Sequence, residues 1–115
     1  MMLDWKELLL QVRKRDDEVA ELSPGTRNGY RALHAAGTQT NHLDQKTREL
    51  IALAVAVTTR CDGCIANHTE KAIKLGLSRE QIAEALGVAV AMNAGAALAY
   101  AGRVMDAYTS IDGKA

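Results

Sequence analysis

The sequence is poor in aromatic residues and in proline. It has no Phe, one Trp, three Tyr and one Pro among 115 residues, although 48% of its residues are hydrophobic. Any core must therefore be built mainly from Ala, Leu, Val and Ile, and Ala removes little apolar surface from water. A chain of this length forms one domain, and such a domain buries only about two-thirds of its unfolded surface. We therefore expect a single domain over residues 1–115 that shares its stability with other copies of the chain, as a homo-oligomer.

The sequence also lacks an excess of charge of either sign. Fourteen basic residues balance fourteen acidic ones. Because a neutral chain has no general field that would hold nucleic acid or an anionic membrane, we expect neither as a partner. Asp4, Lys6 and Glu7 precede any long apolar stretch, which is unlike a secretory signal peptide. The composition therefore predicts a cytoplasmic protein.

One apolar run, residues 85–102, approaches the length of a membrane span. Its only clearly polar side chain is Asn93, but most of its residues are Ala and Gly. These side chains supply little transfer energy, so the run predicts buried helices in a soluble assembly and not a membrane span. Gly87, Ala91 and Gly95 recur every four positions within it, which is typical of close helix packing.

The apolar residues follow helical spacing along the whole chain, which predicts an all-α fold of about six helices. Three helices follow the N-capping residues Asp4, Asp44 and Ser78, and one begins near Cys61. Two more are expected over residues 28–36, ended by Gly37 with Tyr30 and Leu33 facing inward, and over 96–108, after a break at residues 93–95.

The two cysteines form one Cys-x-x-Cys motif, Cys61-Asp62-Gly63-Cys64, at the start of a predicted helix. In a cytoplasmic chain this spacing indicates a redox dithiol or half of a metal site, with inert packing as the alternative. A structural zinc site needs four ligands, and no second paired motif accompanies the cysteines, so we expect neither a metal nor a cofactor. A dithiol at a helix N-terminus is favoured because the helix dipole stabilises a thiolate.

Two further residues accompany the cysteines. His68 lies four residues after Cys64, one turn away on the same helix face, where it can meet the thiol. Glu49 opens an apolar helical run, where an acid is either a first-turn residue or paired with another group. The spacing alone does not bring Glu49 to the cysteines. The helix dipole by itself favours Cys61 as the thiolate, whereas His68 favours Cys64.

Together these segments resemble a known family. The residues concerned are 43–55 (LDQKTRELIALAV), 61–68 (CDGCIANH) and Gly76-Leu77-Ser78. The sequence is similar, over about residues 43–110, to the carboxymuconolactone decarboxylase/alkylhydroperoxidase D (AhpD) superfamily, and the spacing of Glu49, Cys61, Cys64 and His68 is typical of its redox branch. Residues 1–42 would add N-terminal helices to this family core.

The resemblance implies a helical bundle assembled as trimers or hexamers, with the active site near a subunit interface. It further implies that Cys64 attacks a hydroperoxide, that His68 and Glu49 relay protons through water, and that Cys61 closes a disulfide. An external thiol or a disulfide-reducing protein would then regenerate the dithiol. The implied activity is that of a thiol-dependent peroxidase.

Two other functions follow from the same pattern. The family's decarboxylase branch acts without a Cys-x-x-Cys motif, and the sequence shows no obvious cationic cluster for a dicarboxylate, so decarboxylation is disfavoured. A non-enzymatic redox sensor would use the same disulfide to change its assembly. Gly63 stands where better-studied peroxidases of the family often have His or an aromatic residue, so one relay or substrate contact is expected to be missing.

Overall fold

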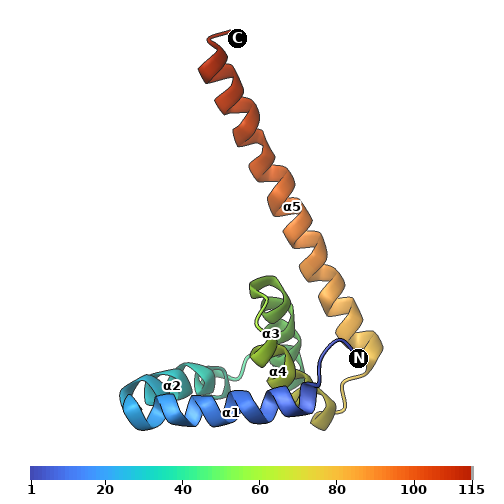
Figure 1. Ribbon diagram of the computed structural model, residues 1–115. Coiled ribbons are helices and arrows are strands. Elements are labelled where there is room, and N and C mark those ends of the chain that lie inside the picture. The colour runs from blue at the N-terminus through green and yellow to red at the C-terminus, as the bar shows by residue number, and fades with distance from the viewer. Residues whose placement is uncertain (115) are drawn as a thin grey trace.

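The computed structural model describes residues 1–114, which form five helices and no strand. The helices are α1 (Trp5–Leu22), α2 (Pro24–Thr40), α3 (Gln45–Thr59), α4 (Asp62–Lys74) and α5 (Arg79–Asp112). Figure 1 shows α1 and α2 as a hairpin beside the α3–α4 pair, whereas α5 contacts α3 and then extends beyond the other helices. The predicted all-helical class is confirmed, with five helices in place of six.

The core lies between α3, α4 and the start of α5. Leu53, Ala72 and Leu77 are buried at its centre, and Ala72 has no exposed surface. Leu50, Ile82 and Leu86 pack around this centre. Among the described residues, no large side chain is completely enclosed. The core is therefore thin, as the composition predicts, and α3 is its central element because it contacts both α4 and α5.

The helix starts follow the predicted caps. Asp44 Oδ1 accepts a hydrogen bond from the Thr47 N–H at 2.7 Å, and Asp4 caps α1 in the same way. Ser78 and Gln81 form a complete capping box, in which each side chain accepts from the other residue's backbone N–H. These local bonds satisfy donors that a helix N-terminus otherwise leaves unpaired.

The predicted bounds of the second helix are wrong. Pro24 occupies the first turn of α2, where its missing N–H costs nothing, so the helix begins earlier than residue 28. The helix also continues through Gly37 to Thr40 and ends at Asn41, which is left-handed and whose N–H donates to the Gly37 carbonyl. A Cβ at Gly37 would lie 2.7 Å from the Arg48 side chain. Arg48 Nη1 donates to the Gly37 and Leu43 carbonyls. Gly37 therefore makes room for the arginine that caps the end of α2.

The inward orientation predicted for Tyr30 and Leu33 is also wrong. Tyr30 is 58% exposed and Leu33 is 79% exposed. The α1–α2 hairpin stands at the side of the α3–α4 pair, so α2 has no helix packed on its outer face (Figure 1).

The predicted break at residues 93–95 does not occur, and α5 runs through it without interruption. Asn93 Nδ2 donates to the Ala89 carbonyl of its own helix at 2.7 Å and to Thr58 Oγ1 of α3 at 3.0 Å. A side chain that bonds back to the preceding turn is compatible with a helix, and here it also ties α5 to the end of α3. A Cβ built at Gly87 or Gly95 would meet no other side chain of the described residues within 4 Å.

Most of α5 is exposed in the single chain. Leu98 is 78% exposed and Val104 is 63% exposed, although both are apolar. By length and composition alone, α5 could cross a membrane. An 18-residue stretch of this helix has a mean hydropathy of 1.6, and only 6% of that stretch is buried. Residues 85–102, which the sequence predicts to be buried, are therefore mostly exposed in a single chain.

The approach of α1 to the start of α4 depends on Gly63. A Cβ at this position would lie 3.2 Å from Cγ1 of Val12. A larger side chain must push α1 outward, since a well-packed contact tolerates little added volume. The packing of α1 on α4 therefore explains the glycine at position 63. Its role is not limited to the absence of a relay group.

We predict that Gly63→Leu lowers the free energy of unfolding by about 1 to 3 kcal/mol, because the added side chain separates α1 from α4. Gly29→Leu in α2 is the matched control, since no atom lies within 4 Å of its Cβ position. Chemical denaturation at one fixed protein concentration checks both variants. Equal stability of Gly63→Leu and the parent chain would contradict this account of Gly63.

Candidate active site

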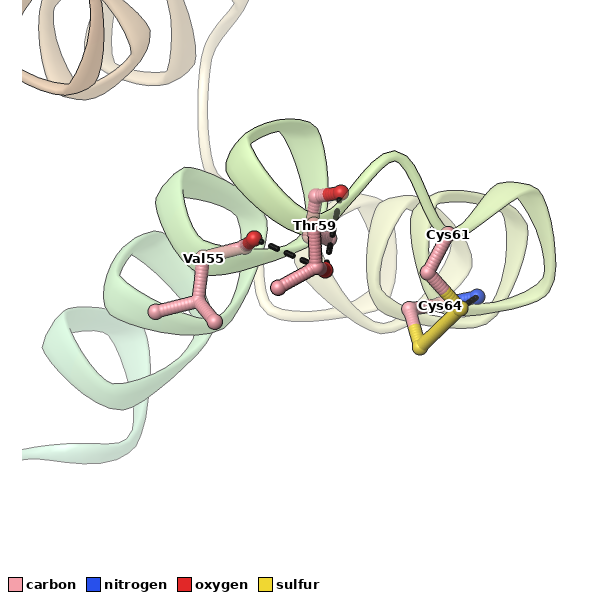
Figure 2. The surroundings of a disulfide bond; sticks show 5 residues. Val55, Thr59, Cys61 and Cys64 are labelled. Atoms are coloured by element: carbon pink, nitrogen blue, oxygen red, sulfur yellow. Dashed lines mark hydrogen bonds between the residues drawn. A yellow bond between two sulfur atoms is a disulfide. The ribbon is translucent and has the colours of Figure 1, made fainter. Parts of the chain in front are cut away.

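The two cysteines lie at the turn between α3 and α4. In the last turn of α3, the Thr59 hydroxyl donates to the Val55 carbonyl at 3.1 Å (Figure 2). Arg60 then ends α3 in the left-handed conformation, with φ of 55°. Cys61 is the N-cap of α4, and its Sγ accepts the backbone N–H of Cys64 at 3.2 Å. The turn thus places the Cys-x-x-Cys motif at a helix N-terminus, as predicted.

Cys61 and Cys64 are joined by a disulfide (Figure 2). Their Cα atoms are 5.2 Å apart, within the usual range for disulfides. Both residues are half-buried. The motif can therefore hold either a dithiol or a disulfide without rebuilding the helix.

His68 and Glu49 form a buried pair next to this motif. His68 lies one turn after Cys64 on α4, and Glu49 reaches it from α3. Glu49 Oε2 and His68 Nδ1 are 2.6 Å apart, and the two residues are 8% and 7% exposed. A carboxylate only accepts, so it fixes the proton on Nδ1 and leaves Nε2 as the basic nitrogen. Glu49 is therefore a paired acid and not a first-turn residue stabilised by the helix dipole.

A cavity of about 720 Å³ opens onto Cys61, Cys64 and His68. Its size is in the range of sites for small molecules, about 300 to 1,000 Å³. Apolar residues of α1 and a tyrosine of α2 form part of its wall: Leu9, Val12, Val19, Ala20 and Tyr30. Charged residues complete it: Arg13, Asp16, Arg27 and Arg31. A small organic molecule can therefore approach the sulfur atoms along a partly apolar wall.

Arg13 links the cavity wall to α4. Its Nη2 donates to Glu70 Oε1 at 2.8 Å and to Asn67 Oδ1 at 3.3 Å. The hydrogen bond from Arg13, followed by one from Lys74, holds the pKa of the Glu70 carboxyl below its ordinary value. These exposed contacts orient α1 over the site, and each contributes little to stability.

His34 also belongs to this arrangement, although no motif in the sequence indicated it. Its ring is stacked on the His68 ring, with centroids 5.4 Å apart and planes 8° apart. No sequence spacing relates residues of α2 to residues of α4. This contact therefore becomes visible only when the α1–α2 hairpin is packed beside α4. Among residues 1–114, no three His, Cys, Asp or Glu side chains converge as a metal-binding group.

Comparisons with known proteins identify the family of the chain. The carboxymuconolactone decarboxylase family model matches residues 24–107, so α2 is included in the match. An uncharacterized protein of Haemophilus influenzae is 50% identical, over 95% of this chain and 96% of its own. An uncharacterized protein of Cupriavidus necator is 29% identical, over 97% and 99% of the two chains.

A solved structure has the same fold. The crystal structure of an apo carboxymuconolactone decarboxylase family protein from Legionella pneumophila is 34% identical in sequence and superposes with a TM-score of 0.73. The superposition covers 92% of this chain and 95% of the other. The chain, with its Cys-x-x-Cys motif beside a buried Glu–His pair, therefore belongs to the carboxymuconolactone decarboxylase family.

Proposed function

We propose that this protein is a thiol-dependent peroxidase that reduces hydroperoxides through a dithiol–disulfide cycle of Cys64 and Cys61. The observation that carries the proposal is the 2.6 Å contact between Glu49 and His68, one helical turn from a cysteine pair that opens onto a cavity. A buried acid paired with an imidazole supplies a base for a thiol and stabilises the imidazolium that forms.

In the first step, His68 Nε2 takes the proton of the Cys64 thiol. The thiolate attacks the terminal oxygen of the hydroperoxide, the O–O bond breaks, and Cys64 becomes a sulfenic acid. The leaving alkoxide receives the proton held on His68, directly or through water, and departs as an alcohol. Glu49 keeps its hydrogen bond to Nδ1 throughout and balances the charge on the ring.

In the second step, the Cys61 thiol attacks the sulfenic sulfur of Cys64. The disulfide forms, the hydroxyl of the sulfenic acid combines with the Cys61 proton, and water leaves. One hydroperoxide and two thiols thus give one alcohol, one water and one disulfide. An external dithiol, or a protein that carries one, must reduce the disulfide and is itself oxidised. The reducing thiol pool of the cytoplasm suits this cycle.

Cys64 is proposed as the attacking thiol because it shares a helix face with His68. The N-cap position of Cys61 also favours a thiolate, since the N–H of Cys64 points at its sulfur. Single replacements separate these two roles, because only the attacking cysteine is needed for the first step.

We predict that Cys64→Ser lowers the rate of thiol oxidation by cumene hydroperoxide by at least about 100-fold, because no thiolate next to His68 remains. Cys61→Ser keeps the first step, so Cys64 accumulates as sulfenic and then sulfinic acid. Stopped-flow measurement on the reduced protein and mass spectrometry of Cys64 check both. Equal rates in Cys64→Ser and the parent chain would refute the assignment, and lactone or carboxylate turnover without either cysteine would support the decarboxylase function.

A second prediction concerns the buried pair. Glu49→Gln slows thiol oxidation by about 10- to 100-fold, because an amide keeps the size of the side chain but cannot balance a charged His68. The control is Glu21→Gln, an exposed acid at the end of α1 that does not line the cavity. Oxidation rates and thermal melts of both variants are compared. If both variants slow the reaction equally, the pair has no special role.

We also propose that the protein assembles into trimers or hexamers through α5. The apolar side chains of α5 are exposed, and the positions of Gly87 and Gly95 leave space for another helix to approach closely. An apolar surface that one chain leaves in water is stabilised when a second copy covers it. Such an assembly would bury the segment for which the sequence predicts burial.

We predict that Leu98→Glu on α5 dissociates the assembly, because a charge in an apolar interface is costly to bury. Leu33→Glu on α2 is the control with matched exposure, 79% against 78% for Leu98. Size-exclusion chromatography with light scattering gives the mass of each. A monomeric parent chain, or an assembly that survives Leu98→Glu and dissociates with Leu33→Glu, would contradict the role of α5.

A further inference from the structure

Three neighbouring rings from two helices connect the buried pair with α2. Tyr30 and His34 are one turn apart on α2, with ring centroids separated by 5.3 Å and planes inclined by 58°. The His34 ring in turn lies parallel to His68 of α4, at 5.4 Å and 8°. His34 thus lies parallel to, and beside, a ring whose Nδ1 is bonded to Glu49. A single hydrogen bond still lets an imidazole pivot, whereas a ring packed against it opposes that motion.

Charged groups from α3 and α4 surround His34. Lys71 and Lys74 of α4 and Arg48 and Glu49 of α3 line the hollow that His34 shares with His68. Partial burial is the main cause that lowers the pKa of His34 below 6.5, and Lys71 and His68 lower it further. Glu49 acts in the opposite direction but is the weakest of these influences. At neutral pH, His34 is therefore uncharged, and only acid adds a proton to it.

We propose that His34 is a positioning residue for His68: its ring holds the His68 imidazole in the orientation that Glu49 selects, and it must be uncharged for His68 to accept the Cys64 proton. This proposal rests on the proposed peroxidase function for its catalytic consequence, and it adds a group from α2 to that site. A cation at 34 would repel the imidazolium that forms on His68, since the two ring centroids are 5.4 Å apart.

Three substitutions separate the shape of His34 from its charge. His34→Phe keeps a flat, neutral ring. His34→Arg keeps a flat group that stacks on rings but carries a permanent charge. His34→Ala removes the ring. The control is His42→Phe, which changes an exposed histidine in the loop between α2 and α3.

We expect His34→Phe and His42→Phe to oxidise with cumene hydroperoxide within about threefold of the parent rate at neutral pH. His34→Ala and His34→Arg are expected to be slower by about tenfold or more. As the pH is lowered below the pKa of His34, the rate of the parent chain is expected to fall by more than that of His34→Phe, because only the parent chain gains a charge at position 34. Thermal melts show whether any variant loses its fold.

If folded His34→Ala oxidises at the same rate as His34→Phe, His34 has no positioning role and the proposal is overturned. If His34→Arg oxidises at the same rate as His34→Phe, the group at position 34 need not be neutral and the proposal is likewise overturned. NMR titration of the His68 imidazole gives an independent reading without any peroxide. His34→Arg is expected to move its midpoint to lower pH than in His34→Phe. If neither the parent chain nor any variant reduces the hydroperoxide, the proposed peroxidase function is wrong. The NMR titration of His68 still tests the coupling of the two rings in that case.

Discussion

The hydrogen bond between Glu49 and His68 connects the fold with the proposed chemistry. It exists only because α3 and α4 lie against each other in one register, which the left-handed Arg60 and the N-cap Cys61 fix at their junction. The buried contact of Leu53 with Ala72 holds the same two helices together below the turn. A polar pair with this little exposure is stable only when both members are satisfied, so the helix packing and the pair depend on each other.

The thin core and the exposed α5 have one origin in the composition. Ala, Gly and short aliphatic residues let helices approach closely, but a single layer of them buries little apolar surface per residue. In this chain the core is confined to α3, α4 and the start of α5, and the remaining length of α5 projects away from it (Figure 1). The apolar surface that α5 leaves exposed is the basis for the proposed assembly.

Local signals predicted the helices well wherever the deciding interaction lies within one turn. Asp44 and Ser78 begin helices because their side chains bond to N–H groups three residues ahead. The same reasoning fails at two residues that were expected to break a helix. Gly37 does not end α2, which continues to the left-handed Asn41, and Asn93 lies within α5, where its amide bonds to Thr58 and to the preceding turn.

The sequence by itself determined the all-helical class, the position of the Cys-x-x-Cys motif at a helix start, and the neighbourhood of Cys64 and His68, because these follow from helical periodicity. The tertiary structure alone decided that Glu49 reaches His68, that His34 stacks on it, and that Gly63 accommodates α1. The physical reason is that each of these contacts joins two different helices. Their relative register is set by packing summed over many weak contacts, and no short stretch of sequence encodes it.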